Sequence, residues 1–134
     1  MPRKTLYILH IVAKLIFAVA LLFIPVFFHG LYGNTYSING IRLGRYLAFF
    51  MIAVSYLAWQ YRDLPVGSEE AIAYSKATTF EWGMIGLFFL IHTLQGGYNY
   101  MGWVTTGLCA VYTVLFAVDG FGIINRQRVQ SKED

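Results

Sequence analysis

Four apolar stretches run through this chain, and the connecting segments between them carry almost all of the charge. The stretches are Leu6–Phe28, Leu43–Trp59, Thr79–Leu94 and Trp103–Gly122. A membrane-spanning helix needs roughly 20 mostly apolar residues, and the middle two stretches reach that length with flanking polar residues. The pattern therefore predicts an all-α polytopic membrane protein, an antiparallel four-helix transmembrane bundle. Its expected spans are residues 6–28, 43–61, 77–95 and 103–122.

The composition agrees with a membrane protein and leaves space for one domain. Hydrophobic residues make up 57% of the 134 residues, and only 13% are charged. A soluble domain carries about 25% charged residues. One small bundle uses nearly all of the chain, so we predict a single transmembrane domain over residues 1–134.

The basic residues are distributed unevenly over the two sides of the predicted bundle. One side carries Arg3, Lys4, Arg62, Lys76, Arg126, Arg128 and Lys132, and the other carries Arg42 and Arg45. The positive-inside rule then places both termini and the 62–78 connection in the cytoplasm, which for a bacterial protein means the inner membrane. Because these residues act as topology signals, nucleic-acid binding is not expected.

The two later connections have distinct helix signals. Pro65 interrupts any helix, Ser68 is a good N-cap, and Glu69 with Glu70 suits the positive end of a helix dipole. The third helix should therefore begin near Glu69, before the apolar stretch itself. The connection at residues 96–100 is tight, which predicts that the third and fourth helices form an antiparallel hairpin.

Aromatic side chains fall near both predicted membrane interfaces, where Trp and Tyr are enriched. Tyr7, Trp59, Tyr61 and Trp82 lie near the predicted cytoplasmic ends. Near the external ends lie Tyr32, Tyr36, Tyr46, Tyr98, Tyr100 and Trp103. We interpret these residues as two interfacial belts.

Ionisable residues inside a span are costly, so each one is a candidate functional residue. The intramembrane polar candidates are His10, Lys14, Glu81, His92, Gln95 and Asp119. Helical periodicity groups the polar residues into one stripe per helix, which is expected to face inward or toward a partner. The stripes are His10 with Lys14; Arg42, Arg45, Phe49, Tyr56 and Gln60; Glu81, Phe88, His92 and Gln95; and Thr105, Cys109, Tyr112 and Asp119.

Depth along the helices sorts these residues into an inner and an outer layer. In the inner layer, Lys14 is placed to pair with Glu81 or Asp119. The alternatives are snorkelling of Lys14 and interfacial placement of the two acids. His10 is expected to be solvated or hydrogen-bonded.

In the outer layer, Arg45 is placed to contact Gln95 or His92. For His92, a hydrogen bond to a neighbouring helix is the structural alternative to a ligand role. Arg42 and Arg45 are expected to contact lipid headgroups at the external surface. Gly83 and Gly86 are expected to permit close helix contact.

Several kinds of chemistry are disfavoured by the residues present. Cys109 is the single cysteine, so the chain forms no internal disulfide. His10 and His92 differ in depth by roughly 15 Å, so one haem would not bridge them. Clustered metal ligands, nucleophile motifs and phosphate-binding loops are not apparent in the sequence. We predict no catalytic residue, no metal and no cofactor, with a bound lipid or quinone as the remaining ligand class.

Three classes of function stay open at this stage. The first is a non-catalytic subunit or assembly partner of a larger membrane complex, which would contact membrane lipids and either other integral subunits or a second copy of itself. The second is a small oligomeric transporter or channel with a Lys14/Glu81/Asp119 relay. The third is a lipid- or quinone-binding protein or enzyme with His92 and Glu81 as acid–base groups. The absence of a catalytic motif favours a protein that is not an enzyme.

Overall fold

A computed structural model describes the backbone of residues 3–34, 37–65 and 67–130, and the side chains of these ranges as far as residue 122. The described elements are all helices: α1 (Arg3–Phe23), α2 (Pro25–Gly30), α3 (Ile38–Tyr61), α4 (Glu69–Leu94) and α5 (Tyr100–Gln130). The long helices, α1, α3, α4 and the 100–122 part of α5, have the length and composition to cross a membrane. The predicted all-α membrane bundle is therefore confirmed.

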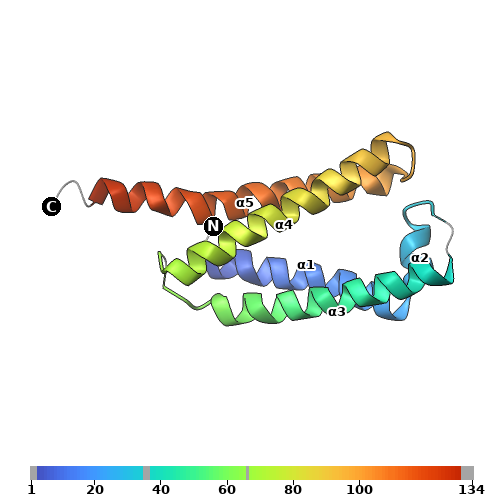
Figure 1. Ribbon diagram of the computed structural model, residues 1–134, viewed down its shortest axis with the longest axis horizontal. Coiled ribbons are helices and arrows are strands. Elements are labelled where there is room, and N and C mark those ends of the chain that lie inside the picture. The colour runs from blue at the N-terminus through green and yellow to red at the C-terminus, as the bar shows by residue number, and fades with distance from the viewer. Residues whose placement is uncertain (1–2, 35–36, 66, 131–134) are drawn as a thin grey trace.

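The bundle consists of two antiparallel helix pairs, as Figure 1 shows. Helix α1 packs along α3, and α4 packs along α5. We call the end that holds Arg3 and the connection between α3 and α4 the proximal end. We call the end that holds α2 and the turn between α4 and α5 the distal end. Helix α2 lies across the distal end, on the side where the two pairs diverge (Figure 1).

Small residues allow α3 to pack closely against α1. The buried face of α3 consists of Gly44, Ala48, Ser55 and Ala58, which recur at helical spacing. At Gly44, an added Cβ would lie 3.4 Å from the side chain of Leu21 on α1. The narrow face leaves most of the remaining α3 surface exposed.

Glycines bring α4 and α5 together at three levels. At Gly86, an added Cβ would lie 3.0 Å from Cβ of Cys109. At Gly102 it would lie against Thr93, and at Gly120 it would lie 3.2 Å from Cβ of Ser75. The steps between these levels are seven and eleven residues along both helices, so the two helices keep one antiparallel register over their whole contact. Close approach at small residues is the usual way for membrane helices to associate.

The close contact expected at Gly83 and Gly86 is present at one of the two positions. A Cβ at Gly83 would make only an ordinary 3.8 Å contact with Thr113. Gly86 is the position at which a side chain would force α4 away from α5.

The first span differs from its expected limits. Helix α1 ends at Phe23, and Ile24 leaves the helical conformation with φ −130° and ψ 46° before Pro25 starts α2. A proline lacks the N–H that would continue the α1 hydrogen bonds, which explains the break within the expected 6–28 span.

Both later helices begin with serine caps. Ser37 accepts a hydrogen bond from the Gly40 amide at 3.2 Å, so α3 begins five residues before the expected start of its span. Ser68 accepts from the Ala71 amide at 3.4 Å, and α4 begins at Glu69 as predicted. In each case the hydroxyl satisfies an amide that has no partner within the first helical turn.

Two apolar clusters form the core, and they differ in extent. The larger cluster lies in the proximal half and contains Leu6, Tyr7, Ile11, Ala58, Trp82, Cys109, Tyr112 and Phe116. The smaller cluster contains Ala18, Leu21 and Ala48, all from α1 and α3. Of these two clusters, only the larger one combines residues of both helix pairs.

Candidate functional site

Polar side chains from α1 enter the space between the two helix pairs. Arg3, Tyr7, His10 and Lys14 are spaced by four, three and four residues, so they share one face of α1. Tyr7 and His10 have no solvent exposure, and Lys14 has 2%. The contacts below show that this face meets polar groups of α4 and α5.

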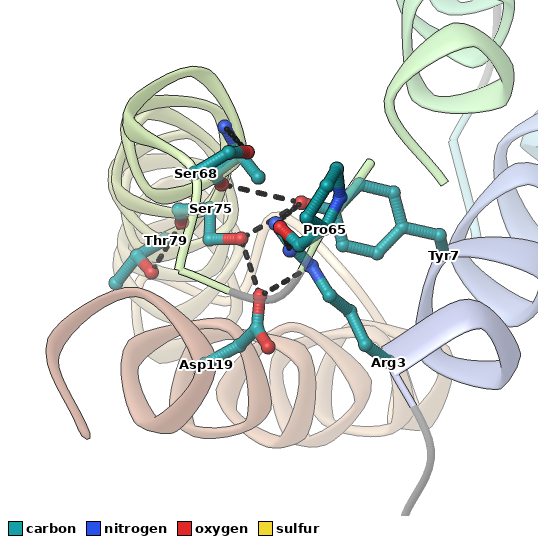
Figure 2. Close-up of polar contacts among 8 residues, drawn as sticks. Arg3, Tyr7, Pro65, Ser68, Ser75, Thr79 and Asp119 are labelled. Carbon is teal, nitrogen blue, oxygen red and sulfur yellow. Dashed lines mark hydrogen bonds and ion pairs between the residues drawn. The ribbon is translucent and has the colours of Figure 1, made fainter. Parts of the chain in front are cut away.

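The proximal end holds a network centred on Asp119 of α5 and Ser75 of α4 (Figure 2). Ser75 donates to the Asp119 carboxylate at 2.6 Å, and Nε of Arg3 lies 3.3 Å from the same oxygen. The hydroxyls of Tyr7 and Ser75 are 2.8 Å apart. Arg3 also donates to the Tyr7 hydroxyl and to the Pro65 carbonyl. One arginine thus joins α1, the α3–α4 connection and α5.

His10 lies one turn deeper and is fixed by two partners from α4. The Trp82 indole donates to Nδ1 of His10 at 2.9 Å, and the Tyr74 hydroxyl lies 3.4 Å from Nε2. An indole N–H can only donate, so Nδ1 must be unprotonated and the proton of the neutral ring must reside on Nε2. His10 is therefore a buried, hydrogen-bonded histidine, and it is not solvated.

Lys14 and Glu81 form an ion pair at the deepest level of this cluster. The Lys14 side chain is 2% exposed and that of Glu81 is 23% exposed. The Lys14 ammonium also lies 5.7 Å from the centre of the Trp82 ring, within the range of a cation–π contact. Of the alternatives for Lys14, the pairing with Glu81 is present, and snorkelling and the pairing with Asp119 are not.

Helix α5 closes the cluster with aromatic side chains. The Tyr112 ring stacks on Trp82 with centroids 4.6 Å apart, and its hydroxyl donates to the Leu9 carbonyl at 3.0 Å. Phe116 is fully buried and contacts the His10 ring edge-on. We call the residues of these contacts the polar cluster: Arg3, Tyr7, His10, Lys14, Tyr74, Ser75, Glu81, Trp82, Tyr112 and Asp119.

A second junction lies at the distal end, where no sequence signal had suggested one. The Asn99 side chain donates to the Leu31 carbonyl at 2.8 Å, and its backbone amide donates to the Tyr32 carbonyl at 3.1 Å. The Tyr32 hydroxyl lies 2.7 Å from Oγ1 of Thr105 on α5. Burial raises the pKa of Tyr32 above its usual value, so the phenol stays protonated. We call Leu31, Tyr32, Asn99 and Thr105 the distal junction.

The expected outer layer does not assemble. His92 makes a 3.0 Å contact with the carbonyl of Phe88, one turn earlier on its own helix, instead of a bond to a neighbouring helix. Gln95 and Arg45 are both exposed, and no contact among the described residues joins Arg45 to either His92 or Gln95. Arg42 is exposed as well. The buried face of α4 is instead Ala71, Ser75, Thr78, Trp82 and Thr93.

Two further expectations need correction, because helix phase and depth alone do not show which face is covered. The α3 stripe of Arg42, Arg45, Phe49, Tyr56 and Gln60 is exposed and does not face inward, because the small residues of α3 form its packed face; that it faces a partner stays a prediction. Tyr7 and Trp82 are core residues, with 0% and 5% exposure, and do not belong to an interfacial belt. In contrast, Thr105, Cys109 and Tyr112 of the α5 stripe are buried as expected.

The described residues do not include any group of three or more His, Cys, Asp or Glu side chains that could hold a metal ion. Comparisons with protein-family models, with curated proteins and with solved structures gave no match to this chain. The polar cluster and the exposed faces are therefore the features of this chain that bear on its function.

Proposed function

We propose that this protein is a non-catalytic integral membrane subunit, which stabilises or assembles a larger complex in a bacterial inner membrane. The observation that carries the proposal is that the ionisable side chains of the polar cluster contact each other within the chain. Lys14 pairs with Glu81, Arg3 pairs with Asp119, and both ring nitrogens of His10 have partners. Groups engaged in this way hold helices together and leave no reactive side chain directed at a substrate.

The same arrangement weighs against a transmembrane relay of protons or ions. Such a relay needs exchangeable groups from one face of the membrane to the other. No acid occurs in residues 15–62 or 82–118, so no carboxylate continues such a path beyond the Lys14–Glu81 pair. The polar cluster therefore supports a structural role, which is to hold the helices together, better than the conduction of protons or ions.

The outward faces supply the surface that a subunit needs. Helix α3 exposes large apolar side chains along most of its length, including Phe49 and Phe50 with 62% and 58% exposure. On α4, Phe80 and Phe88 are exposed with 71% and 49%. We place both termini in the cytoplasm on the basis of the basic residues at the proximal end.

The test is native mass spectrometry of the tagged protein extracted from its own membrane in mild detergent. We expect a defined larger assembly, and we expect F49A/F50A to lose it while the monomer stays folded. The matched control is V114A/V118A, which trims two exposed residues of α5, with 60% and 65% exposure. A wild-type protein found only as a monomer or homo-oligomer, and active in solute flux in liposomes, would contradict the proposal.

A further inference from the structure

We infer that Arg42 and Arg45, together with Tyr46 and Phe49, form a binding site for one anionic phospholipid at the distal end of α3. The inference concerns a lipid ligand and does not depend on the subunit proposal. Both arginines lack an acidic partner among the described residues.

The distal half of the molecule has positive charge but no negative charge. Arg42 and Arg45 are exposed, and neither makes a hydrogen bond or ion pair among the described residues. The absence of any acid from residues 15–62 and 82–118 means that the distal segments of the chain provide no carboxylate for them. Among the described residues no acid pairs with either arginine, so we look for their opposite charge outside the described part of the chain.

Three cations of the proximal end, Arg3, Lys4 and Arg62, differ in this respect. Lys4 lies 2.8 Å from the Asp63 carboxylate, and Nε of Arg62 lies 3.0 Å from its other oxygen. These partners lower the pKa of Asp63 and keep the carboxylate charged. Arg3 pairs with Asp119. The chain thus supplies acids to cations at one end and none at the other.

The spacing along α3 gives each arginine an aromatic neighbour one turn further into the apolar part of the helix. Tyr46 follows Arg42 by four residues, and Phe49 follows Arg45 by four, so each pair shares a helix face. Tyr46 is 70% exposed and Phe49 is 62% exposed. Four residues of helix correspond to about 6 Å of depth.

This layout fits the chemistry of a phospholipid from headgroup to acyl chain. Guanidinium groups bind phosphate oxygens through paired, charge-assisted hydrogen bonds. The aromatic rings below them offer apolar surface to the start of an acyl chain. An inorganic phosphate would use the arginines only, and the rings would then have no part in binding. The combined charged and apolar face therefore favours the lipid over a free anion.

The experiment measures lipid retention by the whole protein. Wild type and variants in mild detergent are titrated with phosphatidylglycerol or phosphatidylcholine, and bound lipid is counted by native mass spectrometry. The variants are R42Q/R45Q and Y46S/F49S. The matched control is K4Q/K76Q, which removes two cations from the proximal end. Circular dichroism confirms that each variant keeps its helical content.

We expect one phosphatidylglycerol on wild type and on K4Q/K76Q, and about thirtyfold weaker retention by R42Q/R45Q, because each surface cation contributes about five- to sixfold. Y46S/F49S should weaken retention by a smaller factor, and millimolar inorganic phosphate should not displace the lipid. Equal retention by wild type and R42Q/R45Q, or equal retention of phosphatidylcholine, would overturn the inference. If R42Q/R45Q does not fold, the wild-type protein provides the test. It should retain phosphatidylglycerol better than phosphatidylcholine and should lose this preference in high salt.

Discussion

The proximal and distal halves of this bundle are joined by different means. In the proximal half, the two helix pairs share one apolar core, and the polar cluster crosses it with two ion pairs and a buried histidine. In the distal half, the described apolar cluster belongs to α1 and α3 alone. There, Leu31 and Tyr32, which follow α2, contact Asn99 and Thr105.

The difference shows how a membrane protein without large loops can define one arrangement of its helices. Apolar packing in lipid discriminates weakly between helix faces, because the lipid tails are also apolar. A charged or hydrogen-bonding side chain in the apolar region has few places where its partners are satisfied. We therefore attribute the relative position of the two pairs mainly to the polar cluster, and we attribute the closure of the distal end to backbone carbonyls and one phenol.

The largest effect is expected from Lys14→Met. The substitution leaves the Glu81 carboxylate without its partner in a mostly buried position, which should destabilise the fold by about 3 kcal/mol. The measurement is the free energy of unfolding by SDS titration in mixed micelles. The double variant K14M/E81L removes both charges and should recover most of the loss. A K14M/E81L protein that is no more stable than K14M would show that the pair does not act as a unit.

A smaller effect is expected from Gly102→Ala, at the close contact between α4 and α5. The added Cβ would collide with Thr93 and would lie 2.8 Å from Cβ of Tyr98, so α5 must shift, at a cost of about 1–3 kcal/mol. Gly107→Ala is the control, because nothing lies within 4 Å of its added Cβ. Both variants are compared in the same unfolding assay. Equal stability of the two variants would mean that α4 and α5 can move apart at Gly102 without a loss of stability.

The smallest effect is expected from Tyr32→Phe in the distal junction. The change removes the hydroxyl that lies 2.7 Å from Thr105 and should cost about 1 kcal/mol. It should also raise hydrogen exchange at the Asn99 amide, which donates to the Tyr32 carbonyl. Tyr100→Phe, at a ring that is 71% exposed, is the matched control. Unchanged exchange at Asn99 would show that the distal end closes without the phenol.

Much of the helix pattern could be predicted from local sequence features. The lengths of the apolar stretches gave four spanning helices, and Ser68 with Glu69 gave the start of α4. Pro25 carried a signal for the end of α1 that the continuous apolar run obscured, since hydropathy does not register the missing amide. Local sequence signals were sufficient to predict a helix boundary wherever a single residue determines the backbone conformation.

The site could be predicted only in part, because pairing depends on which helix faces meet. Depth along the helices was enough to offer Glu81 as a partner of Lys14. It was not enough to exclude Asp119, which pairs with Arg3 instead. The roles of Trp82 and Tyr74 beside His10 were missed because interfacial and core aromatics look alike in a sequence. The spacing of Trp82 with Ser75 and Thr78 on one face of α4 was the signal available.

The span of sequence between the charged partners has a consequence for synthesis. Lys14 and Glu81 are separated by 67 residues, so the ribosome makes the lysine long before its acid. At about 5–20 residues per second, the delay is roughly 3–13 seconds. Asp119 comes later still, close to the end of the chain. During that interval Asp63, Glu69 and Glu70 are made but Glu81 is not, so the ion pair that holds Lys14 forms only after this part of the third long helix has been synthesised.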